Sequence, residues 1–413
     1  MPTFKPFKGV RPNDDYLAQF PTHPLDNFSE EEISAKAQIE DTYMHMIKPY
    51  VTSKSKDIDR NLRKIRSTYE DLVKNYKLVQ DNSSIYLYVQ IYPDNRVFRG
   101  LLGLVSVEDF RNGKIKRHES TITKKKEKLA YYLDKVNIQA EPVLLTYPSN
   151  SKIELLMNLE EKSVPKLNHV DSKGIRHKIW RIDNRLKIQQ FKEVLDQIDA
   201  FYIADGHHRI GSAALNAKNQ QEKNKKHTGN ENYNFVYSYV VSNQSIQIHD
   251  YNRILTSLKG MTPEEFLQKL ETYFKISERG ENPYYPAQKF HFSMYLNKKF
   301  YSLHVKPEFR NPDEALNQLD HYLFDHLVVK NILNIENSDG SHEIKYIKGN
   351  SKIDGIKKLQ EAIDKGEGEV GFGIHPVSFA DMLKISDEKL IMPPKCTYIE
   401  PKLITGLIMY DMK

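Results

Sequence analysis

The chain has 413 residues, and its 61 Lys and Arg against 55 Asp and Glu give a formal net charge of +6. A chain of this length exceeds the size at which single hydrophobic cores usually stop growing, so two or three domains are expected. The charge imbalance is mild, which argues against a dedicated nucleic-acid binder. No apolar run approaches the about 18 residues needed to span a bilayer. The opening MPTFKPFKGVRP has no apolar segment of a secretory signal, so a cytoplasmic location is expected.

Helical and strand patterns alternate along the chain. Periodicity and capping signals predict helices over residues 29–42, 56–79, 123–135, 185–198 and 262–273. Apolar runs bounded by turn signals predict strands over residues 83–92, 98–107, 141–147, 176–183 and 230–243, and a hairpin over 290–305. This mixture indicates an α+β or mixed α/β fold. We expect an N-terminal region over residues 1–218 and a C-terminal α+β region over 232–413, joined by a polar loop able to act as a lid.

The stretch FYIADGHHRIGSAA, residues 201–214, concentrates several chemically active side chains at one predicted strand–turn–helix junction. Asp205 is expected to cap the helix, and Gly206 permits close approach of a ligand. The helix N-terminus attracts anions, and Arg209 can bind two phosphate oxygens at once. His207 and His208 point about 100° apart on a helix, so they are expected to have different roles. We rank phosphate above a transition metal here, because adjacent histidines lack the i, i+4 spacing of helical zinc sites.

Two further clusters accompany this junction. The segment GKIKRHESTIT brings together Arg117, His118 and Glu119, a set able to supply a general base or a carboxylate for magnesium. The segment MPPKCTYIEPK carries Lys395 on a proline-stiffened turn, where a purely structural connection is an equally good interpretation. Cys396 is the single cysteine, which excludes an internal disulfide framework, and we expect it to be a small buried residue.

Several common enzyme signatures are missing from the sequence. It contains no Walker A loop, no G-x-G-x-x-G dinucleotide fingerprint and no G-x-S-x-G elbow. A P-loop kinase, a Rossmann dehydrogenase and an α/β-hydrolase are therefore poor candidates.

The motifs as a set resemble a known family. The segments GLVSVEDFRNGKIKRHESTI, EPVLLTY, FYIADGHHRIGSAA and MPPKCTYIEPKLITGL follow the successive motifs of the domain of unknown function 1015 family, and FKPFKGVRP fits its opening. The resemblance thus covers essentially the whole chain. One departure is THPLDN, where the family usually has a Pro-Pro-Tyr-Asp type segment, so the role of that loop is in doubt.

A more distant resemblance implies the chemistry. IADGHHRIGSAA is similar to a box of the ParB and sulfiredoxin superfamily, in which a glycine turn and a basic helix start bind nucleotide phosphates; that superfamily includes free-serine kinases. It implies a ParB/sulfiredoxin-like core in the N-terminal region. Members of the 1015 family are often encoded beside early enzymes of serine biosynthesis, which also implies serine or phosphoserine metabolism.

The residue clusters and the resemblance together indicate roles for individual residues. The candidates for binding a phosphate are Gly206, His207, Arg209, Arg117 and Lys395. The catalytic candidates are Glu119, His118, Asp205 and His208, with Glu119 or Asp205 as the base or a magnesium ligand.

Three functions remain open on the sequence. The first is a small-molecule phosphotransferase that acts on serine or phosphoserine, with ATP, ADP or pyrophosphate as donor and Mg²⁺ as cofactor. The second is a nucleotide-binding regulator of ParB-like type, against which the lack of a basic recognition helix argues. The third is a metal-dependent hydrolase built on His207, His208, Asp205 and Glu119. In each case we expect a small phosphorylated ligand or a metal rather than a membrane or a nucleic acid.

Overall fold

The computed structural model describes residues 1–52, 57–336, 341–349 and 352–413, so Lys56, the first residue of the predicted helix 56–79, lies outside the described residues. The chain divides into two compact units. Unit 1 contains residues 1–116, 121–246 and 401–413, and unit 2 contains residues 117–120 and 247–400. Helices and strands are mixed in both, which confirms the predicted mixed α/β class.

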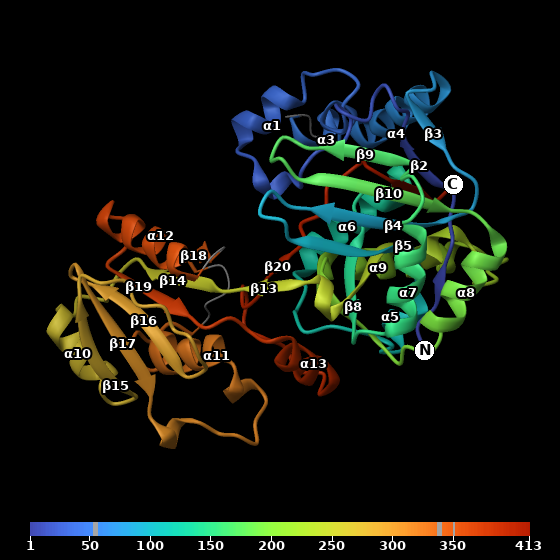
Figure 1. Cartoon of the computed structure of the whole chain (residues 1–413). Coiled ribbons are helices and arrows are strands. Elements are labelled where there is room, and N and C mark those ends of the chain that lie inside the picture. Colours follow the sequence, from blue (N-terminus) through green and yellow to red (C-terminus); the bar gives the residue numbers. More distant parts are fainter. Residues whose placement is uncertain (53–56, 337–340, 350–351) are drawn as a thin grey trace. The chain divides into compact units, whose positions relative to one another are not determined.

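Unit 1 is built on a nine-stranded sheet with the order β6-β11-β8-β12-β5-β4-β10-β9, and β1 also pairs with β5. A smaller sheet, β3-β2-β21-β7, joins the two ends of the chain (Figure 1). The strands of unit 1 are β1 (Phe4–Lys5), β2 (Gly9–Pro12), β3 (Leu78–Gln80), β4 (Ile85–Ile91), β5 (Val97–Ser106), β6 (Ile115–Lys116), β7 (Ile138–Gln139), β8 (Val143–Tyr147), β9 (Leu167–Val170), β10 (Arg176–Ile182), β11 (Phe201–Asp205), β12 (Phe235–Ser242) and β21 (Met409–Asp411).

The helices of unit 1 surround these sheets. They are α1 (Glu30–Lys36), α2 (Tyr43–Met46), α3 (Lys48–Val51), α4 (Ile58–Lys74), α5 (Val107–Arg111), α6 (Thr123–Val136), α7 (Ser151–Glu160), α8 (Arg185–Leu195) and α9 (His207–Lys223). Helix α9 packs against α6, α5 and the strands β8 and β12, and α4 packs against α6. Strands β8 and β12 are buried along their whole length, as expected of strands in the middle of a covered sheet.

Unit 2 is a three-layer arrangement around an antiparallel sheet of order β15-β17-β16-β19-β14-β18. Its strands are β13 (Gln247–His249), β14 (Tyr251–Leu255), β15 (Phe274–Gly280), β16 (His291–Leu296), β17 (Lys299–Val305), β18 (Ile344–Lys348), β19 (Val370–Ile374) and β20 (Tyr398–Glu400), with β13 and β20 forming a separate pair. Its helices are α10 (Pro263–Leu270), α11 (Asp320–Phe324), α12 (Lys352–Asp364) and α13 (Phe379–Asp387).

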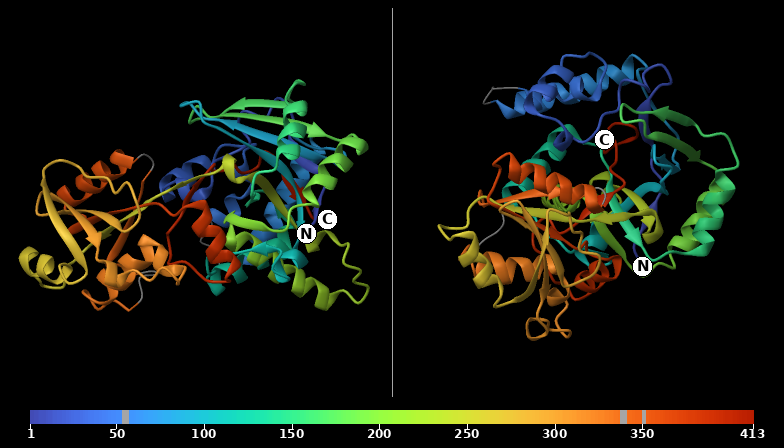
Figure 2. Two further views of the ribbon diagram at one scale, coloured as in Figure 1. Left: turned by 60° about the horizontal axis from the view of Figure 1, so that its bottom comes forward. Right: turned by 60° about the vertical axis from the view of Figure 1, so that its left-hand side comes forward.

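Alternation along the strands of unit 2 decides which helix covers which face. Phe292 and Met294 of β16 join the cluster formed with α10 and α11, whereas Tyr295 joins Ile356 and Leu359 of α12. Successive side chains of a strand point to opposite faces, so α12 covers one face and α10 and α11 cover the other. Figure 2 shows the same strands, in orange, with α12 along one side.

Most predicted elements lie where the sequence places them, and the differences have local causes. Helix α4 ends at Lys74, short of residue 79, because Tyr76 adopts a left-handed backbone conformation and is exposed. Helix α9 runs to Lys223 and so enters the predicted loop 218–232; Lys, Gln and Glu in that stretch are good helix formers. Unit 1 also continues past this loop to residue 246, because β12 lies between β8 and β5 in its sheet.

The other predicted helices and strands are present, but α1 ends at Lys36, short of residue 42, and β12 begins at Phe235, later than residue 230. The hairpin predicted over 290–305 is β16 and β17, with Asn297 and Lys298 both at positive φ as a two-residue type I′ turn requires. Within the described residues, no helix combines the length and the apolar character needed to cross a bilayer.

Candidate functional site

The start of α9 is an uncapped helix N-terminus. Strand β11 ends at Asp205, and Gly206 turns the chain with φ +99°, a left-handed conformation that favours glycine. Gly206 therefore occupies the cap position, and no side chain there accepts a hydrogen bond from the first turn. The prediction that Asp205 caps the helix is wrong: its Oδ2 instead accepts a hydrogen bond from Arg209 Nη2 at 3.0 Å.

Sheet topology brings other charged side chains to this turn. Strand β8 runs antiparallel to β11, with Leu144 opposite Asp205, so the residues just before β8 lie beside the start of α9. Glu141 is one of them, and it forms an ion pair with Arg209 Nη1. Lys402, in the segment that returns to unit 1, places its Nζ 3.7 Å from Asp205 Oδ2. The result is an alternating set of two carboxylates and two cations.

Arg209 is held firmly in this set. Its side chain is 20% exposed and is fixed from both sides by Asp205 and Glu141. Burial lowers the pKa of Arg209 to about 10, and the negative charge of Asp26 opposes this change. The guanidinium therefore keeps its positive charge at neutral pH. Arg209 is therefore held in one orientation and remains charged, and phosphate recognition requires both.

The second turn of α9 packs against α6 and the residues just before it. Strand β6 runs parallel to β11, so both end at the same edge of the sheet. A methyl group added at Gly211 would lie 3.6 Å from Lys126 Cδ and 3.8 Å from Thr121 Cγ2. Gly211 thus lets a threonine and a lysine approach the second turn of α9.

The two histidines have different environments, as their adjacency on a helix predicts. His207 is buried at 4% exposure, and His208 is half-buried. The backbone carbonyl of His208 accepts a hydrogen bond from Ser212 Oγ at 2.6 Å. Of the two rings, that of His208 is the more accessible to a ligand.

The remaining predicted site residues belong to unit 2. Arg117 and Lys395 are exposed, Glu119 is half-buried and His118 is buried at 1% exposure. The carbonyl of His118 accepts a hydrogen bond from Met392 N at 2.8 Å. Lys395 has φ +55°, and its carbonyl accepts from Arg253 Nη2 at 3.0 Å. Thus the predicted residues fall into two groups, one in each unit.

Cys396 lies beside Lys395 in the interior of unit 2. It is buried, and burial raises the pKa of its thiol well above the ordinary value. The charges of Arg253, Asp325 and Glu119 act on it less strongly. A buried thiol held in its neutral form fits the expectation of a structural residue rather than a nucleophile.

Sequence reasoning missed two members of the group around α9, Glu141 and Lys126, because each reaches α9 through strand pairing or helix packing. Lys402 is, like Lys395, a candidate cation of the segment MPPKCTYIEPK, and its ion pair with Asp205 connects it with the turn.

The same geometry limits which metals these residues could hold. In the part of the chain that the structure describes, no group of three or more His, Cys, Asp or Glu side chains gathers as a metal site. Asp205 and Glu141 offer two hard carboxylates beside Arg209. That pair fits Mg²⁺, which proteins commonly bind through one or two carboxylates together with substrate phosphates. It does not fit the ligand set that a metal-dependent hydrolase would need.

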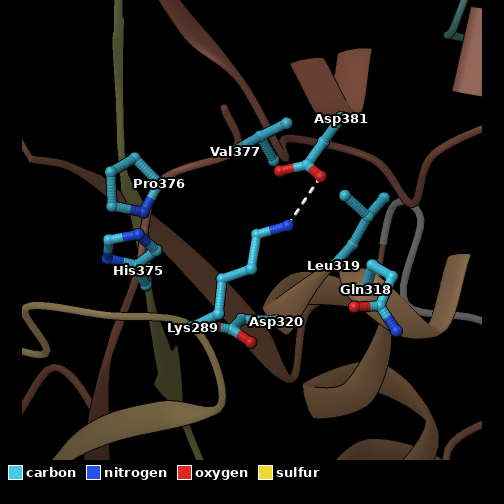
Figure 3. A pocket seen from close by; sticks show the side chains of 8 residues that line it. All are labelled: Lys289, Gln318, Leu319, Asp320, His375, Pro376, Val377 and Asp381. Atoms are coloured by element: carbon cyan, nitrogen blue, oxygen red, sulfur yellow. Dashed lines mark hydrogen bonds and ion pairs between the residues drawn. The ribbon is translucent and has the colours of Figure 1, made fainter. Parts of the chain in front are cut away.

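A hollow in unit 2 is lined by none of the predicted residues (Figure 3). Lys289 crosses it toward Asp381, and Asp320 and His375 form parts of its wall.

Comparison with known proteins gives a family and some solved relatives. None of the curated proteins compared matches the chain. Among solved structures, a free serine kinase mutant in complex with ADP is 13% identical, with a TM-score of 0.36 over 75% of this chain and 91% of that one. A conserved hypothetical protein from Pyrococcus furiosus is 13% identical, with a TM-score of 0.33 over 75% and 94%. C-terminally truncated SbnI from Staphylococcus aureus is 12% identical, with a TM-score of 0.37 over 72% and 82%.

The family assignment rests on the match of a family model. The model described as "Protein of unknown function (DUF1015)" matches residues 4–322, which is more than half of the chain. The order of motifs noted in the sequence agrees with this match, and the chain belongs to the DUF1015 family.

Proposed function

We propose that the protein is a phosphotransferase that binds a phosphate group at the start of α9 and acts on a small hydroxy compound, with serine or phosphoserine as the leading substrate. One observation carries the proposal: Arg209 is fixed by two carboxylates at a helix N-terminus that no side chain caps. The positive end of the helix dipole attracts an anion there. The choice of serine rests on the similarity between the DGHHR box and that of free-serine kinases.

The chemistry that this site offers is mainly positioning and charge neutralisation. Phosphoryl transfer needs the donor phosphates held in place and their negative charge balanced. Arg209 at the start of α9 would bind phosphate oxygens, and Lys402 adds positive charge nearby. When bound, Mg²⁺ would supply further neutralisation; Glu141 would hold it, together with Asp205 where Asp205 is not the base.

The acceptor hydroxyl needs a general base. Asp205 is the candidate within the α9 group, since its carboxylate is 43% exposed and lies within the ion-pair set. Glu119 and His118, both in unit 2, stay candidates from the sequence alone. The variants Asp205→Asn and Glu119→Gln separate these assignments: loss of turnover with retained nucleotide binding identifies the base.

Phosphorus NMR tests the proposed function directly. The purified protein is incubated with serine, Mg²⁺ and, in turn, ATP, ADP or pyrophosphate, and in the reverse direction with phosphoserine and, in turn, ADP, AMP or phosphate. We expect a phosphoserine signal to appear or disappear with one donor. Arg209→Lys keeps the charge but loses the planar two-pronged donor, so turnover should fall by at least about tenfold.

The control is Arg185→Ala, which removes an exposed arginine from α8 and should leave turnover unchanged. Phosphate-ligand binding with no turnover of any hydroxy compound would instead favour the nucleotide-binding regulator. No binding of any phosphate compound would refute the proposal.

A further inference from the structure

The hollow of unit 2 contains an acidic group whose second oxygen has no partner. Asp320 is 3% exposed, and its Oδ1 accepts a hydrogen bond from Phe290 N at 2.8 Å. Its Oδ2 is buried and has no hydrogen-bond partner among the described residues. A buried polar atom left in this state is costly in a folded protein and is a sign of a missing donor.

The surroundings show which donor would fit. Lys289 Nζ donates to Asp381 Oδ1 at 2.6 Å, and its side chain crosses the hollow toward that partner and away from Asp320 (Figure 3). Asp381 is fixed in turn by Ser378, whose hydroxyl donates to its Oδ2 at 2.6 Å. His375 donates from Nδ1 to the carbonyl of Pro286 at 3.1 Å, and burial lowers the pKa of its ring.

The charges among these lining groups do not balance. Two carboxylates, Asp320 and Asp381, face one ammonium, because His375 is neutral at physiological pH. The remaining positive charge near Asp320 is that of Arg310, whose guanidinium is occupied by the carbonyl of Val305 and the ring of Phe290. A small cation that carries N–H donors would satisfy Asp320 Oδ2 and would compete with Lys289 for Asp381.

We propose that the hollow around Asp320, Lys289 and Asp381 is a binding site for the primary ammonium group of a small ligand. Lys289 occupies the hollow, so a ligand inserts its ammonium end only when Lys289 moves aside. The ammonium donates to Asp320 Oδ2 and shares the carboxylate of Asp381. This site lies wholly in unit 2 and is independent of the phosphate site proposed at α9.

The site has a built-in pH dependence. Burial raises the pKa of Asp320 to about 7. The N–H of Phe290 and the charges of Lys289 and Arg310 oppose this rise, and the negative charge of Asp381 adds to it. Only the ionised carboxylate binds the ammonium. The ionised fraction rises from about a tenth at pH 6 to about nine tenths at pH 8, so the apparent affinity should rise by about tenfold.

Thermal unfolding of the full chain with methylammonium chloride tests the site. Two salts at equal ionic strength are the controls: tetramethylammonium has the same charge without N–H donors, and potassium is a simple cation. We expect a concentration-dependent rise of the melting temperature with methylammonium alone, larger at pH 8 than at pH 6. An equal rise with potassium or tetramethylammonium would overturn the assignment, and so would no rise at either pH.

Three variants locate the effect. Asp320→Asn keeps the acceptor for Phe290 N but removes the charge, so the methylammonium effect should vanish, whereas the exposed Asp313→Asn should retain it. Lys289→Met keeps the length of the side chain and removes the resident ammonium, so the apparent affinity should increase. An unchanged effect in Asp320→Asn, or an unchanged affinity in Lys289→Met, would refute binding between these carboxylates.

Discussion

At the scale of single residues, the turn around Gly206 determines where the guanidinium of Arg209 lies. A methyl group on Gly206 would lie 2.7 Å from Arg209 Nε, and the backbone there has φ +99°. An alanine would therefore strain the backbone and also displace the arginine from its two carboxylates. Substituting Gly206 should therefore affect both the stability of the protein and the binding of a ligand at Arg209.

The variant Gly206→Ala tests both consequences. We expect a loss of about 1–2 kcal/mol in the free energy of unfolding from the left-handed backbone alone, and weaker binding of phosphate ligands as well. Gly229→Ala is the matched control, since Gly229 has φ +91° and no atom within 4 Å of an added methyl group. Urea unfolding and ADP titration of both variants check this; equal ADP affinity in the two would show that displacement of Arg209 has no effect.

The sequence predicts the role of a residue best when its contact partners lie close to it along the chain. The cluster from Asp205 to Arg209 is contiguous, so its position at a strand–helix junction could be read directly. The wrong assignment of Asp205 as the cap arose because its partner Arg209, four residues on, competes for the same carboxylate. Glu141 could not be found, since it reaches Arg209 only through the antiparallel pairing of β8 and β11.

At the scale of elements, the hairpin of β16 and β17 has a turn that its sequence only partly favours. Asn297 and Lys298 have φ of 47° and 60°, and asparagine tolerates this conformation better than lysine does. We expect Lys298→Gly to stabilise the protein by about 1 kcal/mol, measured by urea unfolding. Lys298→Ala should give no such gain, because alanine is strained in the same way; an equal gain would contradict the backbone explanation.

The same two strands place a pair of histidines face to face. His291 and His304 are cross-strand partners with ring centroids 3.8 Å apart. Burial lowers the pKa of His291, and the charges of His304, Arg310 and His375 lower it further. Burial also lowers the pKa of His304, with added effects of Arg279, Lys275 and Arg310. Protonation of this pair is therefore easier in the unfolded chain than in the folded one.

This difference gives a pH dependence of stability. The folded pKa values lie below the unfolded value of about 6.5, so the folded protein binds fewer protons in this window and loses stability as pH falls below about 6.5. His304→Gln should reduce the loss of stability between pH 7 and pH 5.5, measured by urea unfolding of unit 2. The exposed His342→Gln should not change it. Equal pH slopes in the two variants would contradict the role of the stacked pair.

At the scale of the whole molecule, the chain forms two units that each possess a sheet and buried core of their own. The chain passes between them four times, at residues 116/117, 120/121, 246/247 and 400/401. We expect two unfolding transitions in calorimetry, because domains with separate cores commonly unfold as separate units. Leu145→Ala, in β8, should lower the melting temperature of unit 1, and Leu270→Ala, in α10, should lower that of unit 2. Each shift should correspond to a loss of about 2–5 kcal/mol in the free energy of unfolding. A single transition shifted equally by both would contradict this.

Sequence reasoning predicted the fold class and the types of the long elements, because hydrophobic periodicity and capping signals are local. It placed the division of the chain between residues 218 and 232, whereas unit 1 continues to residue 246 and regains residues 401–413. That arrangement depends on β12 entering the middle of the sheet and on β21 pairing with β2. Such pairings join residues far apart in the chain, and no single segment carries a signal for them.

Isothermal titration of ADP with Mg²⁺ into the full-length protein tests the central claim, a phosphate site at the start of α9. Arg209→Ala removes the guanidinium, Arg209→Lys retains the charge, and Arg185→Ala is the control on the exposed face of α8. The account predicts binding in the unaltered protein and in the control, with a loss of about 1.5–3 kcal/mol, at least tenfold in affinity, in Arg209→Ala and a smaller loss in Arg209→Lys. Equal affinity in all four proteins would place the nucleotide elsewhere and contradict the account.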